Sequence, residues 1–212
     1  AGAFPFQIAI EIGGYDAHEN AAVLVSTYHT FAENTPNVIV LHDMIPEVTG
    51  QDLSLPEWRA KAKAIDKSCG YLAVSQSTLN DFRSLYPQHA DRPVVLAHNA
   101  VGDELQPAGS ESVRAFKEKH RIQKPYFLLV GNRGIYKNAI LFFRAFALLE
   151  NRHEFEIVCA GGPAELESSL KPYVRGVRCH MLRLSDAELS AAYAGAVALA
   201  YPSRYEGFGM PI

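Results

Sequence analysis

Several features that would point to particular classes of protein are scarce in this chain of 212 residues. It has 3 cysteines, an odd number that argues against a disulfide framework, and all lie in apolar stretches: Cys69, Cys159 and Cys179. The net charge of −3 provides no basic surface for nucleic acid. No apolar run approaches the roughly 20 residues of a membrane-spanning helix. We therefore expect a soluble, cytoplasmic globular protein with buried free thiols and no nucleic-acid partner.

Short β-branched runs alternate with amphipathic helical segments along most of the sequence. Strands are predicted at 38–41, 71–74, 93–97, 126–130, 155–160, 177–180 and 197–201. This alternation is typical of βαβ units, in which helices cover a parallel sheet. A turn-rich stretch at 99–109 interrupts it, so we place a domain boundary near residue 105. The sequence predicts an α/β fold with two Rossmann-like domains, 1–105 and 106–212. Both are expected to be incomplete, with 7–12 as the candidate opening strand.

Capping residues indicate where several helices begin. Ser54 with Glu57 and Ser185 with Glu188 have capping-box spacing, and Ser75 can cap a helix alone. Two further helices are predicted from Asn138 and from near Pro163. For the first of these, the predicted apolar face consists of Leu141, Ala145, Leu148 and Leu149. The helix after Ser54 is predicted to carry a solvated basic face of Arg59, Lys61, Lys63 and Lys67.

Glycine-containing turns follow three predicted strands in the second half of the chain. These turns are Gly131-Asn132-Arg133, Gly161-Gly162-Pro163 and Glu206-Gly207-Phe208-Gly209. Ligands of open α/β sheets bind at the carboxyl ends of the strands, where such turns lie. Arg133 and Lys137 bracket a loop that leads into a helix, and two cations beside backbone N–H groups suit a diphosphate. The alternative is a pair of solvated surface cations.

Glu206 stands beside glycines whose N–H groups would attract phosphate, although a carboxylate repels it. The conflict disappears if the ligand is anionic on one side and hydroxylated on the other. Backbone N–H groups would then bind the phosphate, while Glu206 accepts hydrogen bonds from sugar hydroxyls. The alternative is a carboxylate that only interacts favourably with a helix dipole. We prefer the sugar interpretation because the whole motif supports it.

The stretch 202–212 closely resembles the signature of retaining glycosyltransferases of family four, also called group one. The segments 130–138 and 184–189 are similar to the same family's first phosphate loop and to the run-up to its signature. The resemblance covers roughly 38–212. It implies the GT-B fold, with an acceptor-side domain, a nucleotide-sugar-binding domain and a cleft between them. It also implies truncation at both ends, because a second glutamate would fall two residues beyond Ile212.

The resemblance assigns donor-binding roles to residues of the second half. Arg133 and Lys137 would bind the pyrophosphate, Glu206 would hold the transferred sugar, and the nearby turns would contact sugar, phosphate or nucleoside. The residues in those turns are Gly131, Gly207, Phe208, Gly209, Leu184 and Asp186. One departure is that many members place the arginine directly after the glycine, where this chain has Asn132.

In the first half, the segment 40–47 resembles the family's strand end, whose histidine faces the donor sugar. His42 would hydrogen-bond a sugar hydroxyl and help shape an oxocarbenium-like transition state; the alternative is a structural histidine. No Asp-x-Asp motif and no zinc-ligand spacing occur in the sequence. We therefore expect no metal and no cofactor, with leaving-group charge offset by Arg133, Lys137 and a helix N-terminus.

Together these observations predict a metal-independent glycosyltransferase that moves a hexose with retention. The donor would be a nucleoside-diphosphate sugar and the acceptor a saccharide or a lipid-linked one, with Glu206 and His42 as catalytic residues. One alternative is a nucleotide-sugar epimerase of the same fold. Another is a truncated chain that binds nucleotide without turnover. The family also implies weak peripheral membrane contact, which no basic amphipathic helix in the sequence supports.

Overall fold

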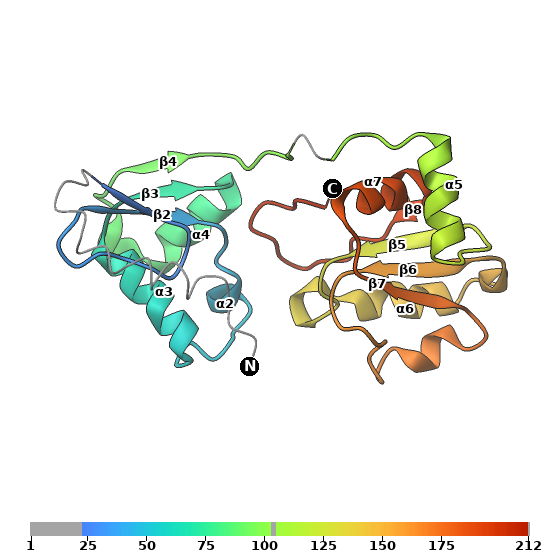
Figure 1. Ribbon diagram of the computed structural model, residues 1–212. Helices are drawn as coiled ribbons and strands as arrows, with labels where there is room; N and C mark the ends of the chain where they lie inside the picture. The colour runs from blue at the N-terminus through green and yellow to red at the C-terminus, as the bar shows by residue number, and fades with distance from the viewer. Residues whose placement is uncertain (1–22, 103–104, 212) are drawn as a thin grey trace. The chain divides into compact units, whose positions relative to one another are not determined.

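The computed structural model describes residues 23–102 and 105–211 and divides into two α/β units (Figure 1). Unit 1 comprises residues 1–99 and Glu206–Gly209, and unit 2 comprises residues 100–205 and 210–212. Each unit holds a four-stranded sheet in which every strand pair is parallel, so the predicted α/β class with parallel sheets is confirmed. The expected opening strand at 7–12 lies outside the described residues. Within these, no helix has the length and apolarity needed to cross a membrane.

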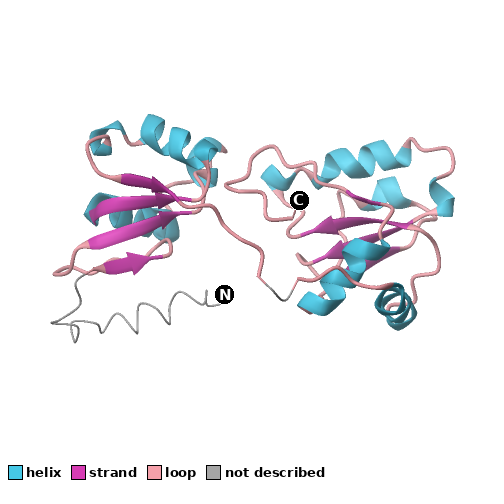
Figure 2. Cartoon of the chain, turned by 90° about the horizontal axis from the view of Figure 1, so that it is seen from above, coloured by secondary structure: helices cyan, strands magenta, loops and turns pink. Residues whose placement is uncertain are grey.

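The sheet of unit 1 has its strands in chain order, with helices in the connections after β2 and β3 (Figure 2). Its strands are β1 (Leu24–Ser26), β2 (Asn37–Leu41), β3 (Ser68–Ala73) and β4 (Val94–Leu96). Its helices are α2 (Ile45–Val48), α3 (Pro56–Lys67), α4 (Gln76–Leu85) and the 3-10 helix η2 (Pro87–His89). Alternate residues of β2 are buried, and Ile39 and Leu41 pack with Ile65 of α3, Tyr71 of β3 and Phe82 of α4. This core fixes the carboxyl end of β2, which leads directly into His42.

Unit 2 has the strand order β7-β6-β5-β8, so the chain runs outward from β5 and then returns to its other side. Its strands are β5 (Tyr126–Val130), β6 (Glu156–Ala160), β7 (Cys179–Leu182) and β8 (Ala198–Leu199). Its α-helices are α5 (Ser110–Lys119), α6 (Ala139–Ala147) and α7 (Asp186–Gly195). Its 3-10 helices are η3 (Ile135–Lys137), η4 (Arg152–Glu154) and η5 (Lys171–Val174).

Helices cover both faces of the unit 2 sheet, and the alternation of side chains along β5 shows why. Leu128 packs in one core cluster with residues of α5 and α7, whereas Leu129 packs in another with Phe143 and Phe146 of α6. Figure 1 shows α5 and α7 on one side of this sheet and α6 on the other. Burial on both faces accounts for the continuous apolar runs of its strands.

The predicted apolar face of α6 is wrong. The buried residues are Ala139, Phe143 and Phe146, whereas Leu141 is 56% exposed and Leu148 84% exposed. The predicted residues and the buried ones both have helical spacing. However, the helix ends at Ala147, so Leu148 and Leu149 of the predicted face lie beyond it. The face that carries the larger phenylalanine rings is the one packed against the sheet.

The cysteine and capping predictions are partly wrong. Cys69 is exposed, whereas burial raises the pKa of Cys159 to about 12 and that of Cys179 to about 11, which keeps both thiols protonated and unreactive. Leu55 occupies the N-cap position of α3, and the Ser54 hydroxyl instead donates to the Asp52 carboxylate at 2.6 Å. Ser75 does cap α4, because its hydroxyl accepts a hydrogen bond from the Thr78 N–H at 3.0 Å.

The second predicted capping box is confirmed at α7, and its glutamate also connects this helix to α5. Ser185 and Glu188 cap each other reciprocally, and the Glu188 carboxylate accepts hydrogen bonds from Lys119 Nζ at 2.7 Å and His120 Nε2 at 3.0 Å. The Lys119 ammonium, followed by the backbone N–H of Ser185 and the His120 ring, lowers the pKa of Glu188 from 4.5 to about 2.

This depressed pKa predicts acid sensitivity of unit 2. The stabilisation by Glu188 is fully present above pH 4.5 and disappears as the pH falls toward 2, since the unfolded carboxyl binds its proton first. We expect the melting temperature of Glu188→Gln to be below that of the wild type at neutral pH and to converge with it in acid. Thermal unfolding followed by circular dichroism measures both, and parallel curves at all pH values would contradict the assignment.

Candidate functional site

The loops after β5 and β8 adjoin each other at the carboxyl edge of the unit 2 sheet. The chain leaves β5 toward β6 on one side and returns through β8 on the other, so this point is a topological switch point. Ligands of open α/β sheets bind in the crevice that forms there. Two hydrogen bonds join the loops: Asn138 Nδ2 donates to the Pro202 carbonyl at 3.1 Å, and the Arg204 N–H donates to the Tyr136 carbonyl at 2.8 Å.

Lys137 is half-buried at this junction, at the end of η3. Its ammonium lies 5.4 Å from the ring centroid of Tyr136 and 5.8 Å from that of Tyr201. Aromatic faces attract a cation without neutralising its charge. The predicted N-cap residue Asn138 has a left-handed φ of 53° and makes no side-chain capping bond; its Nδ2 donates to the Pro202 carbonyl.

A cavity of about 650 Å³ opens beside this junction, over the carboxyl ends of β5, β6 and β7. Its lining residues are Val130, Gly131, Asn132, Ala160, Gly161, Gly162, Arg183, Leu184 and Leu189. Gly131 has a φ of 93°, a conformation in which a side chain would be strained. Two of the predicted donor-binding residues, Gly131 and Leu184, thus share one cavity. Asp186 is exposed in the first turn of α7 and is not among the lining residues.

Arg133 is held by the loop that follows β6. Its guanidinium side chain is 1% exposed, and Nε pairs with the Glu167 carboxylate at 2.9 Å. The same group donates to the carbonyls of Gly161 at 3.0 Å, Pro163 at 2.9 Å and Glu165 at 3.2 Å. Because the carbonyls of this segment bond to a side chain, the α-helix predicted near Pro163 is absent, and η5 is the next helical turn. The predicted diphosphate contact of Arg133 stays a prediction.

In unit 1, His42 follows β2 directly and is half-buried. Burial lowers its pKa from 6.5, and the neighbouring Asp43 carboxylate only partly opposes this, so the imidazole is neutral at neutral pH. Its ring centroid lies 5.9 Å from that of Tyr28. A neutral ring can either donate or accept a hydrogen bond, which is the property that contact with a sugar hydroxyl requires.

The signature loop Glu206–Gly209 is grouped with unit 1. Glu206 is half-buried, Gly207 is buried and the Phe208 ring is 39% exposed. Gly209 has a φ of 93°, so the turn after Phe208 requires the freedom of glycine. The predicted roles of these residues toward sugar and phosphate stay predictions.

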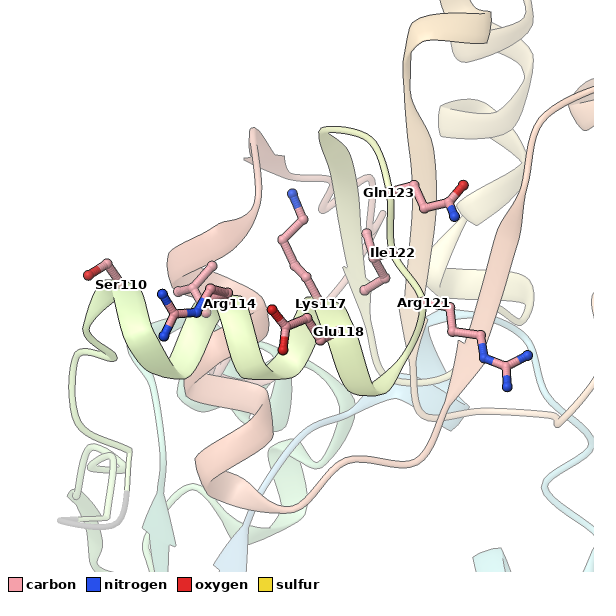
Figure 3. A pocket seen from close by; sticks show the side chains of 8 residues that line it. Ser110, Arg114, Lys117, Glu118, Arg121, Ile122 and Gln123 are labelled. Carbon is pink, nitrogen blue, oxygen red and sulfur yellow. The ribbon is translucent and has the colours of Figure 1, made fainter.

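A second cavity, of about 610 Å³, lies on the outer side of α5 and is lined by charged side chains (Figure 3). Arg114, Lys117 and Arg121 surround it, but its lining comes only from residues 110–123, which precede β5. None of the loops at the carboxyl ends of the strands contributes to it. The switch-point cavity is therefore the better candidate for a ligand site.

Within residues 23–102 and 105–211, no group of three or more His, Cys, Asp or Glu side chains is placed to hold a metal ion. The expectation of a metal-independent reaction stays a prediction, to be tested by experiment.

The second half of the chain matches a known family. Residues 112–212 match the description "Glycosyl transferases group 1". This part of the chain, just under half of its length, is therefore similar to the group 1 glycosyltransferases. The match includes both switch-point loops and the Glu206 signature, which are the segments that carried the resemblance in the sequence.

Similarity to individual proteins extends over nearly the whole chain. The O-antigen chain mannosyltransferase B of Escherichia coli is 26% identical over 206 residues, which cover 87% of this chain and 54% of the relative. The chain therefore spans about half the length of this relative. The crystal structure of WaaG, a glycosyltransferase involved in lipopolysaccharide biosynthesis, matches 100% of this chain and 62% of its own with a TM-score of 0.72 at 15% identity. HepE of Anabaena, crystallised with UDP and glucose, matches 99% of this chain and 61% of its own with a TM-score of 0.69 at 13% identity. These structural likenesses concern the fold, and they confirm the predicted GT-B type.

The sequence analysis did not predict that the side chains of Arg133 and Lys61 are buried. Arg133 was expected to face an anion, and Lys61 was assigned to a solvated face of α3, which is wrong because Lys61 is 1% exposed. Lys61 does have a signal in the sequence: it is four residues before Ile65, a helical spacing that places both on the packed face. Lys61 was assigned to the protein surface because of its charge alone.

Proposed function

We propose that the protein is a metal-independent glycosyltransferase that moves a hexose, with retention, from a nucleoside-diphosphate sugar to a saccharide or lipid-linked acceptor. The observation that carries this proposal is the junction of the β5 and β8 loops within the part of the chain that matches the group 1 glycosyltransferases. Lys137 adjoins this junction, and the cavity beside it has room for a nucleoside. The names of the similar mannosyltransferase and of WaaG support a role in polysaccharide biosynthesis.

In the proposed reaction, Lys137 and backbone N–H groups at the switch point stabilise the negative charge of the departing nucleoside diphosphate. Glu206 accepts hydrogen bonds from hydroxyls of the transferred sugar, and neutral His42 bonds a further hydroxyl as the sugar becomes oxocarbenium-like. Gly131 and Leu184 contribute to the cavity proposed for the nucleoside. Retention and the roles of Glu206 and His42 derive from the resemblance to the family.

The direct test is transfer by the full-length protein with a panel of nucleoside-diphosphate mannoses and glucoses. We expect nucleoside diphosphate release to depend on a saccharide acceptor, and NMR of the product to show the anomeric configuration of the donor. Conversion of the donor without acceptor would instead indicate an epimerase. Nucleotide binding in calorimetry, with no turnover of any donor, would support a binding protein.

Metal independence gives a separate prediction. We expect transfer to persist undiminished in excess chelator, because cations of the protein and a helix N-terminus stabilise the leaving group. Initial rates with and without chelator measure this. A complete loss that returns when a divalent cation is added would overturn the metal-independent form of the proposal and leave the transferase assignment intact.

A further inference from the structure

A network of buried polar side chains in unit 1 bonds to the main chain directly after His42. Its central residue is Lys61 of α3, which is 1% exposed, and its ammonium donates to the Glu47 carboxylate at 2.8 Å and to the Asp43 carbonyl at 3.0 Å. The same ammonium lies 5.0 Å from the ring centroid of Tyr28. A cation without access to solvent thus bonds to the main chain one residue after His42.

Both acidic members of this network have further partners. The side chain of Glu47 is 7% exposed, and its second carboxylate oxygen accepts a hydrogen bond from the Tyr86 hydroxyl at 3.1 Å. One oxygen of Asp43 accepts hydrogen bonds from the Tyr28 hydroxyl at 2.8 Å and from the Ile45 N–H at 2.9 Å. The segment from His42 to Glu47 is therefore held by side chains from α3, from Tyr86 just after α4, and from the segment after β1.

A gain in stability does not account for burying this pair. Removing a lysine and a glutamate from water carries a large desolvation cost, and apolar residues of similar size often replace a buried ion pair without loss of stability. What the ammonium provides, and an apolar side chain cannot, is a directed hydrogen bond to the Asp43 carbonyl. That bond defines the path of the backbone at the point where the His42 ring is attached.

We infer that Lys61 is a positioning residue of the proposed transfer reaction, whose buried ammonium holds the Asp43 carbonyl and so fixes the orientation of His42. This inference rests on the proposed function only for its effect on turnover. Its structural part, the control of the His42 ring by Lys61, can be tested without any substrate.

The test uses the double variant Lys61→Met/Glu47→Gln in the full-length protein. It removes both charges together, and the glutamine oxygen can still accept the Tyr86 hydrogen bond. The matched control is Lys63→Met, on the same helix, whose side chain is 58% exposed and whose ammonium lies 3.6 Å from Glu33. Fluorescence of the single tryptophan, Trp58 of α3, reports whether unit 1 remains folded.

We expect the double variant to fold, to keep its KM for the donor, and to lose kcat by on the order of tenfold to a hundredfold through misplacement of His42. NMR signals of the His42 ring should shift in the double variant and coincide with those of the wild type in Lys63→Met. Unchanged kcat and unchanged ring signals in a folded double variant would each overturn the inference.

The two proposals fail in different ways. A wild-type protein that transfers no sugar refutes the proposed function, and the His42 signals then still decide the positioning role of Lys61. If the double variant does not fold, Lys61→Leu/Glu47→Gln, which also lacks a donor to the Asp43 carbonyl, replaces it under the same criteria. If the wild type is active and the folded variants are fully active as well, only the positioning role of Lys61 is refuted.

Discussion

Replacing Glu206 by glutamine is expected to lower sugar transfer by roughly a hundredfold or more while leaving nucleoside diphosphate binding unchanged. The substitution keeps the size of the side chain, but it replaces one acceptor oxygen by an NH2 donor and removes the negative charge that would stabilise a cationic transition state. Loss of an interaction made only in the transition state lowers kcat and kcat/KM together. Initial-rate kinetics and calorimetry with the nucleoside diphosphate measure the two quantities separately.

The matched control is Glu150→Gln, which makes the same chemical change at an exposed position just after α6. It should transfer at the wild-type rate. Unchanged turnover in Glu206→Gln would refute the catalytic assignment. Weaker binding of the nucleoside diphosphate itself would indicate that Glu206 contacts the nucleotide and not the sugar. Equal melting temperatures of the two variants would exclude unfolding as the cause of lost activity.

Predictions that depended on local spacing agree best with the structure. The strand at Tyr126–Val130 has the predicted limits, and α7 begins directly after its predicted cap, Ser185. Ser185 with Glu188 satisfies both bonds of the capping box, and the Ser185 hydroxyl also donates to the Glu188 carboxylate at 3.1 Å. Ser54 has the same spacing to Glu57, but its hydroxyl bonds to Asp52. The same spacing thus gives a cap at α7 but not at α3, where the serine hydroxyl bonds to the Asp52 carboxylate.

Predictions that depended on long-range packing were less successful, and two buried cations show why: Lys61 was wrongly placed at the surface, and the burial of Arg133 was not predicted. The partners of Arg133 lie 28 to 34 residues further along the chain, and one partner of Lys61 lies 18 residues earlier. Spacing in the sequence carries no information about such distant carbonyls. The resemblance to a family identified the loops of the candidate site, but it gave no indication that Arg133 would be turned into the next loop.

The two cations of the switch-point loop are expected to respond differently to loss of charge. In Arg133→Met, the Glu167 carboxylate and three loop carbonyls lose their common donor, and we expect the free energy of unfolding of unit 2 to fall by about 3 kcal/mol. In Lys137→Met, the fold should remain intact, while nucleoside diphosphate binding weakens by about tenfold or more because a charged contact is lost. Chemical denaturation and calorimetry on both variants measure the two effects.

A third variant, Arg133→Lys, separates charge from geometry at this position. A lysine ammonium is a point charge and cannot bond to Glu167 and to the carbonyls of Gly161, Pro163 and Glu165 at once, so stability should stay low although the charge is kept. If Arg133 instead binds the diphosphate directly, as the family resemblance implies, Arg133→Met will unfold like the wild type and Arg133→Lys will recover much of the lost binding. Many members of the family have their arginine where this chain has Asn132. We therefore expect that Arg133→Met and Arg133→Lys lower the stability of unit 2, and that Lys137 is the cation that binds the diphosphate.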